Sequence, residues 1–228
     1  MNLKILCKCT EMLSLDQTIS KRLFEAKEFP WEVLGEIGEF ILKAGPTLDK
    51  EIYDQISENI WVAKNAKIYP SAHITAPAII GENTEVRHCA FLRGNTLVGN
   101  NCVVGNSTEL KNVILFNGVQ VPHYNYVGDS ILGYKAHMGA GSITSNVKSD
   151  KTLVQVKYGN EIIDSNRKKF GVIIGDNVEI GCGSVLNPGS VIGRGTSVYP
   201  LSSVRGYVPG NSIYKLKQEY EVIEKITC

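Results

Sequence analysis

Large aliphatic residues recur at every sixth position over a long stretch of this chain, and this period constrains the fold more than any other feature. The grid consists of Val62, Ile68, Ile74, Ile80, Val86, Leu92, Val98, Val104, Leu110 and Phe116. A period of six fits neither the 3.6 of a helix nor the alternation of a sheet strand. It is typical of a parallel β-helix, in which each hexapeptide forms one short strand and a corner, and three hexapeptides build one triangular coil.

A second residue type follows the same grid. Four positions after each of the first eight grid residues stands a small side chain, namely Ala66, Ala72, Ala78, Thr84, Ala90, Thr96, Cys102 and Thr108. We expect the large residue to fill the coil interior and the small residue to lie where the chain turns. Successive coils then stack at the usual spacing of strands, about 4.7–4.9 Å.

The grid slips once and is interrupted once. From Val121 it no longer holds, and it resumes in a new phase at Leu132, Met138 and Thr144. A further run follows at Ile174, Ile180, Leu186, Ile192, Val198 and Val204. A slip in an otherwise strict repeat indicates that something other than stacking has selected the sequence there.

Residues 1–58 precede the repeat and have a helical pattern. We expect one helix from Leu15 to Leu23, a second opened by Pro30 and stopped by Gly45-Pro46, and a short third through Ile52 and Ile56. Repeat arrays need polar caps at their ends, so this lead-in is predicted to cover the first open coil. A docking element for a partner or a neighbouring subunit is the alternative.

Two other segments depart from the repeat, which otherwise spans 59–211. The excursion 148–170 alternates over Thr152–Tyr158, turns at Gly159-Asn160 and returns, which predicts a β-hairpin or flap over the acceptor or toward another subunit. At the C-terminal end, 212–228 is predicted to form a closing helix. Its apolar face consists of Ile213, Leu216, Tyr220 and Ile223.

Composition excludes several classes of protein. The 24 basic and 23 acidic residues nearly balance, so general affinity for nucleic acid or anionic lipid is not expected. No apolar run is long enough to cross a membrane, and the first residues have no signal-peptide core. The six scattered cysteines therefore predict reduced thiols in a cytoplasmic protein. Cys7 and Cys9 are too close together for a zinc site, and no metal site is predicted.

One motif carries a closer resemblance. The run Pro122–Asp129, followed by Gly139-Ala140-Gly141 and Asn146, resembles the acetyltransferase half of bacterial bifunctional N-acetylglucosamine-1-phosphate uridyltransferases. The resemblance covers roughly 93–217. It implies a left-handed parallel β-helix, a homotrimer with sites between subunits, and transfer of an acetyl group from acetyl-CoA to glucosamine 1-phosphate or a related amino-sugar phosphate, a step toward UDP-N-acetylglucosamine.

The resemblance also implies roles for particular residues. His123 is the expected general base. The expected sugar-phosphate ligands are Arg93, Lys111, Tyr126 and Asn146, with Lys168 or Lys169 in place of the family's downstream phosphate-binding lysine. Ala140, Cys182 and Pro200-Leu201 are expected along the pantetheine arm of coenzyme A, and Lys215 near its nucleotide phosphates. Cys182 replaces the family's usual serine.

The chemistry fits these roles. An amino sugar arrives as an ammonium and must lose a proton before its nitrogen can attack a thioester. Histidine titrates near pH 6.5, which suits a general base. Asn125 or a nearby carbonyl could fix its tautomer, and a backbone N–H between Gly139 and Gly141 could stabilise the oxyanion.

Two departures leave the acceptor open. His137 stands where the family has a sugar-contacting asparagine, and 148–170 replaces a short loop. An alternative is therefore a non-catalytic trimeric module, with a binding or regulatory role in sugar-nucleotide metabolism. A third reading is a carbonic anhydrase of the same scaffold, with His88 and His123 as zinc ligands.

The family's bifunctional members also carry a nucleotidyltransferase domain, to which nothing in this sequence is similar. We therefore expect the purified chain to release no pyrophosphate from UTP and a sugar phosphate. A coupled pyrophosphate assay measures this, and robust turnover by the chain alone would contradict the expectation.

Overall fold

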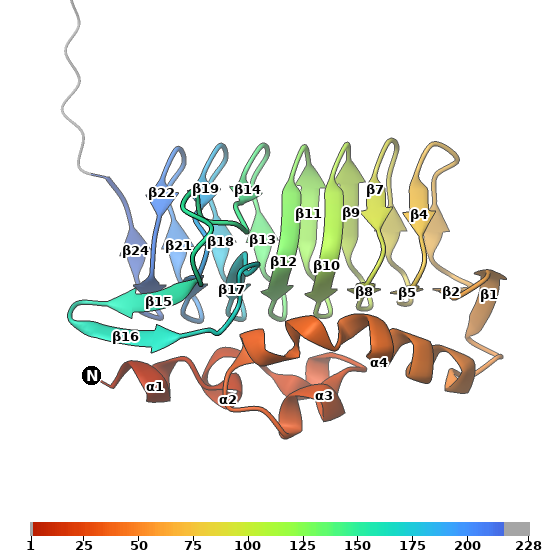
Figure 1. Cartoon of the computed structure of the whole chain (residues 1–228). Coiled ribbons are helices and arrows are strands. Elements are labelled where there is room, and N and C mark those ends of the chain that lie inside the picture. Colours follow the sequence, from red (N-terminus) through yellow and green to blue (C-terminus); the bar gives the residue numbers. More distant parts are fainter. Residues whose placement is uncertain (1, 217–228) are drawn as a thin grey trace, which may run out of the picture.

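The computed structural model describes residues 2–216, and in them the repeat forms a left-handed parallel β-helix (Figure 1). Three faces build each coil. The covered face consists of β2 (Ile60–Ala63), β5 (Ala78–Ile80), β8 (Thr96–Val98), β17 (Val172–Ile174), β20 (Ser190–Ile192) and β23 (Tyr207–Val208). The third face consists of β3 (Lys67–Ile68), β6 (Glu85–Val86), β9 (Val103–Asn106), β11 (Gln120–His123), β13 (His137–Met138), β18 (Glu179–Ile180), β21 (Ser197–Val198) and β24 (Ile213–Tyr214).

The remaining face, which we call the site face, joins the third face to the covered face. It consists of β4 (His73–Thr75), β7 (Phe91–Arg93), β14 (Ile143–Thr144), β19 (Val185–Leu186) and β22 (Ser203–Val204). Two long strands, β10 (Glu109–Leu115) and β12 (Tyr126–Leu132), begin on the site face and continue onto the covered face. Their partners along both faces are parallel.

The grid residues fill the interior as predicted. All are buried except Ile68 and Ile74, which are partly exposed in the first coil. Some of the small corner residues also form hydrogen bonds to the neighbouring coil through a side-chain hydroxyl. Thr84 Oγ1 donates to the Gly99 carbonyl at 2.7 Å and accepts from the Cys102 amide at 3.0 Å. Stacking is therefore reinforced by polar contacts inside the corners.

Asparagine makes many of the tight corners possible. Asn83, Asn95 and Asn101 have φ of 54°, 48° and 56°, in the left-handed region that asparagine tolerates better than most residues. The frequent asparagines of the repeat are thus a direct consequence of its short turns.

The slip in the grid begins earlier than predicted. Leu115, and not Phe116, pairs with Val98, so the coil loses a residue between Leu110 and Leu115. Phe116 is displaced to the corner, where its ring meets Phe24 edge-on at 5.6 Å. The predicted grid position of Phe116 was wrong because the shortened corner and a contact with the N-terminal helices both favour the neighbouring residue.

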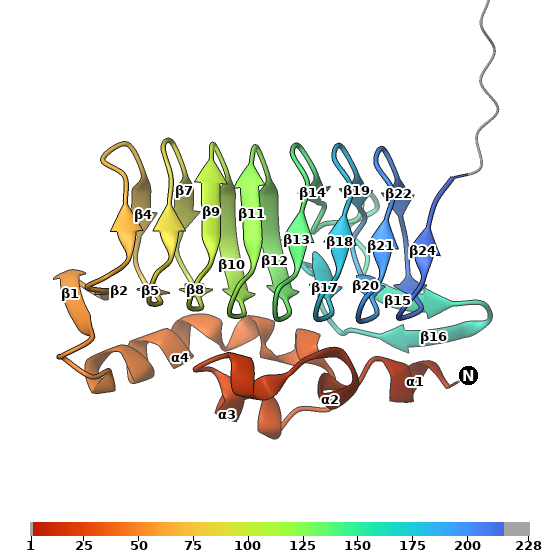
Figure 2. The same cartoon turned by 180° about the vertical axis from the view of Figure 1, so that it is seen from behind.

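The N-terminal segment forms a layer of short helices along the covered face (Figures 1 and 2). Its elements are α1 (Leu3–Leu6), α2 (Cys9–Met12), η1 (Leu15–Gln17), α3 (Lys21–Glu25), η2 (Pro30–Gly35), α4 (Ile37–Ala44) and η3 (Gly45–Thr47). The helix expected from Leu15 to Leu23 is thus split into η1 and α3. The second run ends at Gly45-Pro46 as expected.

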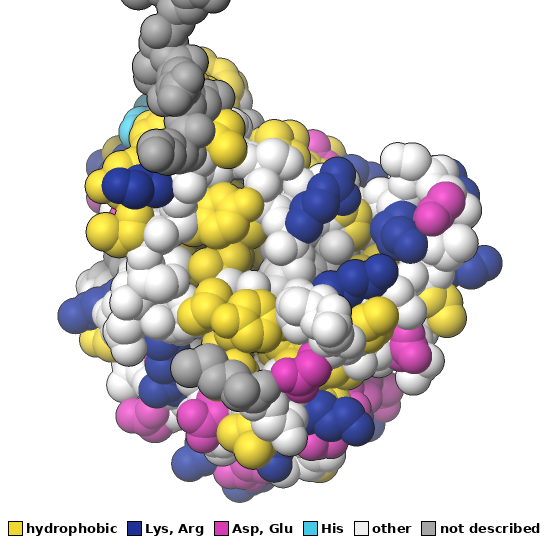
Figure 3. All heavy atoms as spheres, turned by 90° about the vertical axis from the view of Figure 1, so that its left-hand side faces the viewer, with side chains coloured by type: hydrophobic (Ala, Val, Ile, Leu, Met, Phe, Trp, Pro, Cys, Tyr) yellow, Lys and Arg dark blue, Asp and Glu magenta, His cyan; other side chains and the backbone are white. Residues whose placement is uncertain are grey.

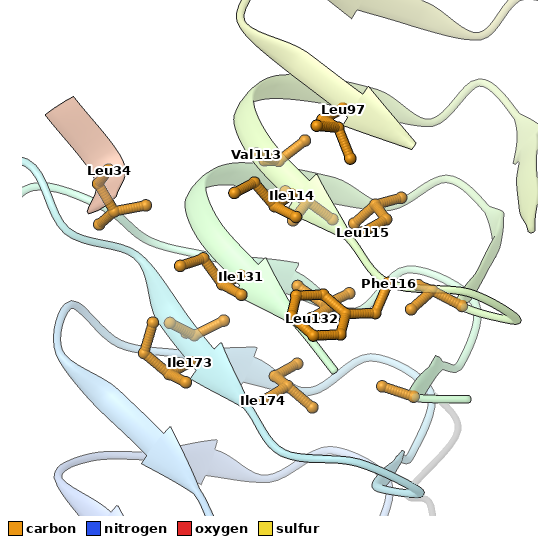
Figure 4. Close-up of a cluster of buried hydrophobic side chains, with 14 of the residues drawn as sticks. Leu34, Leu97, Val113, Ile114, Leu115, Phe116, Ile131, Leu132, Ile173 and Ile174 are labelled. Atoms are coloured by element: carbon orange, nitrogen blue, oxygen red, sulfur yellow. The ribbon is translucent and has the colours of Figure 1, made fainter. Parts of the chain in front are cut away.

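The layer does not cap the first coil, which corrects the prediction. It covers a row of outward side chains that are almost fully buried, namely Ile79, Leu97, Ile114, Ile131, Ile173, Val191 and Tyr207. Figure 4 shows Leu34 of η2 outside the strand that carries Ile131. Trp31 reaches Phe170 with 5.5 Å between ring centroids. An apolar row of this length cannot face water, and this explains where the helices pack.

The first coil is closed by a strand instead. β1 (Tyr53–Ser57) pairs antiparallel with β2, where a third helix through Ile52 and Ile56 was expected. Asn59, with φ of 56°, turns the chain into this hairpin. An open coil edge offers unpaired backbone groups, and these outweigh the weak tendency of an isolated helical turn.

Of the two other predicted departures from the repeat, the hairpin is confirmed and the start of the closing helix is wrong. The excursion contains the predicted hairpin, β15 (Gln155–Tyr158) and β16 (Glu161–Asp164), turning at Gly159. The closing helix expected over 212–228 is wrong at its start, since Ile213–Tyr214 is strand β24 paired with β21. Its remaining part, 217–228, lies outside the described residues.

Two further expectations concern cysteines and membranes. All five cysteines within residues 2–216 are free thiols, and burial raises the pKa of Cys7, Cys9 and Cys102 to about 12. None of the helices in this part of the chain has the length and apolarity that a membrane crossing requires.

Truncation of the outward row tests its contribution to stability. We expect Ile131→Ala to lower the free energy of unfolding by about 2–5 kcal/mol, because it leaves a cavity between the coil and the helical layer. The matched control is Ile162→Ala, at a side chain 52% exposed, with an effect within about 0.5 kcal/mol. Denaturant titration compares both, and equal effects would contradict the packing described.

Candidate functional site

His123 lies on the edge where the third face meets the site face, on the side of the coils away from the helices (Figure 1). A backbone ladder runs along this edge, which we call the site edge. The Gly141 amide donates to the His123 carbonyl at 3.0 Å, Gly183 to Ala140 at 2.9 Å, and Leu201 to Cys182 at 2.9 Å. Equivalent positions in successive coils are therefore occupied by His123, Ala140, Cys182 and Pro200. Leu201 directly follows Pro200 in the same coil.

This alignment brings together residues that are far apart in the sequence. The structure places the expected general base one coil from Ala140, and the expected pantetheine contacts one and two coils beyond. Adjacent coils lie about 4.8 Å apart, so the row from His123 to Pro200 extends roughly 14 Å. Lys215 lies near the C-terminal end of this edge, with its Nζ 5.9 Å from the centroid of the Tyr199 ring. Cys182 and Leu201 are both exposed.

Asn125 has a structural task other than the one suggested for it. Its Oδ1 accepts from the His123 backbone amide at 3.1 Å, and its Nδ2 donates to the carbonyls of Gly139 and Ser142 at 2.9 and 3.1 Å. The side chain is buried and fully engaged with main-chain groups, so it fixes the loop and not the imidazole. The His123 ring itself is exposed, and within residues 2–216 no side chain bonds to it.

The glycine loop beside His123 presents one unused amide. Gly139 N donates to the Ile180 carbonyl at 2.7 Å, and Gly141 N donates to His123. The Ala140 N–H between them has no main-chain acceptor among the described residues. It is therefore the donor on this loop that is free to meet a developing negative charge.

A buried carboxylate organises the far end of the site face. Asp129 occupies a tight corner with φ of 47° and is 4% exposed. Lys111 Nζ donates to its two oxygens at 3.1 and 2.9 Å, and Asn112 Nδ2 donates to Oδ1 at 3.0 Å. Asn146 Nδ2 donates to Oδ2 at 2.5 Å. We call Lys111, Tyr126, Asp129 and Asn146 the acceptor cluster.

Tyr126 joins this cluster to the rest of the face. Its hydroxyl accepts from Asn146 Nδ2 at 3.4 Å. Burial, followed by the charges of Asp129 and Glu109, raises the pKa of Tyr126, so the phenol stays protonated and remains a donor. Arg93 donates to Glu109 at 2.6 Å, and this hydrogen bond raises the pKa of the guanidinium.

The cluster carries no excess positive charge. The two upstream cations expected to bind the sugar phosphate, Arg93 and Lys111, are paired with carboxylates. Asp129 is the residue that the sequence analysis missed, although it closes the motif quoted above. The available signal was a carboxylate in an otherwise apolar strand, which requires a buried partner.

The remaining candidate residues lie in three different places. Lys168 and Lys169 are exposed, and Lys169 pairs with Val147 in an isolated antiparallel bridge beside Asn146. His137 is placed elsewhere, since it lies on the third face with its Nδ1 2.7 Å from Glu179 Oε2. The family departure at His137 therefore does not alter the acceptor cluster. His88 is on the site edge, two coils from His123, and no group of three metal-ligating side chains occurs within residues 2–216.

Fold and repeat place the chain among the left-handed β-helix proteins built from hexapeptide repeats. Within that class it is a relative of proteins named Bifunctional protein GlmU. One from Methanococcus maripaludis strain S2 is 36% identical over 198 residues, which is 86% of this chain and 48% of that protein. One from strain C5 is 32% identical over the same number of residues and the same shares of both chains.

Other comparisons are more limited. A bifunctional sugar-1-phosphate nucleotidylyltransferase/acetyltransferase of Sulfurisphaera tokodaii is 32% identical over 56% of this chain and 32% of that protein. The chain spans about half the length of the curated GlmU relatives it matches. A hexapeptide transferase family protein from Anaplasma phagocytophilum superposes with a TM-score of 0.36 at 17% identity, over 67% of this chain and 70% of that one. That superposition is too loose to bear on function. No family model matches the chain.

Loss of the central carboxylate tests the acceptor cluster. We expect Asp129→Ala to destabilise the protein by roughly 3 kcal/mol, because it leaves the partly buried Lys111 ammonium without its ion-pair partner and removes one acceptor each from Asn112 and Asn146. Glu109→Ala is the control, since its partner Arg93 is exposed and a solvated ion pair contributes little to stability. Adding Lys111→Met to Asp129→Ala should recover part of the loss in a double-mutant cycle, and strict additivity would contradict the coupling.

Proposed function

We propose that the chain transfers an acetyl group from acetyl-CoA to the amino group of glucosamine 1-phosphate or a closely related amino-sugar phosphate. The observation that carries this proposal is the site edge, on which His123, Ala140 and Cys182 are aligned. The relatives support it, since one of them is named as an acetyltransferase as well as a nucleotidylyltransferase.

The proposed reaction uses two groups of the edge. The His123 imidazole accepts a proton from the ammonium of the sugar, and the freed nitrogen attacks the thioester carbonyl. The Ala140 N–H donates to the oxyanion of the tetrahedral intermediate. When the intermediate collapses, the C–S bond breaks, and the imidazolium returns its proton to the departing thiolate. The nitrogen loses its second excess proton to water, so that a neutral amide remains. The products are the N-acetylated sugar and coenzyme A.

The substrates approach from different directions in this proposal. The pantetheine arm follows the site edge past Ala140, Cys182 and Leu201 toward Lys215. The sugar lies on the site face, where the Tyr126 hydroxyl and the Asn146 amide meet its polar groups. The reacting nitrogen and the thioester then meet beside His123.

We further propose that the chain acts as a homotrimer. The covered face is occupied by the chain's own helices, so a neighbouring copy must approach the site face or the third face. The site edge lies between these two faces. A partner subunit would thus border the coenzyme path, as the resemblance to interfacial sites implies.

Replacement of the base tests the proposal. We expect His123→Ala to lower thiol release from acetyl-CoA with glucosamine 1-phosphate by roughly 10²-fold or more, because no other described side chain can take the proton there. His88→Ala is the matched control on the same edge and should leave the rate unchanged. Undiminished turnover by a folded His123→Ala protein would refute His123 as the base. Absence of both turnover and acetyl-CoA binding in the wild type would favour the non-catalytic module.

A further inference from the structure

A cavity lies on the site face, beyond the acceptor cluster and beneath the hairpin of the excursion. Its volume is about 470 Å³, and its polar lining includes Ser145, Lys148, Gln155, Lys157, Asn187 and Arg205. No residue of this group was a candidate in the sequence analysis. We call it the hairpin pocket.

The hairpin is held closely against the coils, so the pocket is formed before any ligand arrives. Gly206, with φ of 72°, lies under β15, and a Cβ there would be 2.3 Å from the Lys157 carbonyl oxygen. Tyr158 meets Tyr207 edge-on at 5.4 Å between ring centroids. From the other side, the Leu3 amide of α1 donates to Glu161 Oε2 at 2.9 Å. The roof of the pocket is thus fixed to both the β-helix and the helical layer.

The pocket holds the positive charge that the acceptor cluster lacks. Arg205 belongs to the same outward row of the site face as Arg93 and Lys111. Those two cations are paired with carboxylates, whereas neither Arg205 nor Lys157 has an ion-pair partner among residues 2–216. Lys148 is 3.3 Å from Asp150, the one carboxylate that lines the pocket. Lys and Arg side chains gather on this part of the C-terminal end of the molecule (Figure 3).

The neutral groups of the lining suit the same kind of ligand. The hydroxyls of Ser145 and Ser149 add donors to two unpaired cations, an arrangement that matches the several oxygens of a phosphate. The amides of Gln155 and Asn187 instead donate to Asp164 and to the Val204 carbonyl and hold the lining in place. Among residues 2–216, no aromatic ring that could stack on a base lines the pocket. The lining therefore favours the phosphate group itself over a nucleobase.

We propose that the hairpin pocket binds a phosphate or diphosphate group through Lys157 and Arg205. Asn146 stands between Ser145 and Val147 of the lining and also contacts Tyr126 and Asp129, so the pocket adjoins the acceptor cluster. The phosphate has two sources in principle, the acceptor sugar of the proposed reaction or a separate phosphate compound. Only the first source rests on the proposed function.

Binding of inorganic pyrophosphate, measured by titration calorimetry, tests the site without any acetyl transfer. We expect Lys157→Gln/Arg205→Gln to weaken binding by at least about 30-fold, since two charge-assisted contacts are lost. The control is Lys64→Gln/Lys151→Gln, which removes the same charge at exposed positions outside the pocket and should leave binding nearly unchanged. Wild-type protein that does not bind pyrophosphate, or equal losses in both double variants, would overturn the proposal.

Acetylation kinetics then separate the two sources. If the acceptor supplies the phosphate, the Lys157/Arg205 variant has a raised KM for glucosamine 1-phosphate and an unchanged KM for glucosamine, and pyrophosphate competes with the sugar phosphate. If a separate compound supplies it, both KM values stay unchanged while pyrophosphate binding is still lost. Either result supports a phosphate site. Calorimetry tests whether the pocket binds pyrophosphate even if the chain acetylates neither sugar.

Discussion

The burial of the covered face on both sides is the constraint on which the rest of this structure depends. Its strands point one set of aliphatic side chains into the coils and another set outward beneath the helical layer. Each such outward side chain stabilises the fold by about 1.5–3 kcal/mol when it leaves water. The helices therefore occupy one face, and the other two faces and the edge between them, where we propose that the substrates bind, are free of this layer.

The groups proposed for proton transfer and oxyanion binding lie apart from the unpaired cations. The site edge offers an exposed imidazole and a free backbone amide, whereas the acceptor cluster is a neutral set of hydrogen-bonding groups held by Asp129. Two unpaired cations lie further along the same face, in the hairpin pocket.

Much of the fold could be predicted because a six-residue period has few structural solutions. The residues of the site edge were expected from the resemblance and not from the period, since the slip and the excursion 148–170 interrupt the repeat between His123, Ala140 and Cys182. Other features depend on contacts between coils and could not be predicted. The pairing of Lys111 with Asp129 requires the shortened corner, and the position of the helices requires the second residue of each apolar doublet, such as Ile131 beside Leu132.

The central claim is that coenzyme A lies along the site edge, and alkylation of Cys182 tests it most directly. Cys182 is exposed on the proposed path, and Cys89 is exposed beside His88 toward the other end of the same edge, which makes it an internal control. Rates of maleimide labelling at each thiol can be followed by mass spectrometry with and without acetyl-CoA. The account predicts that acetyl-CoA slows labelling of Cys182 by about tenfold or more, as expected at site occupancy above nine-tenths, and leaves Cys89 unaffected. Equal labelling of Cys182 at saturating acetyl-CoA would contradict it.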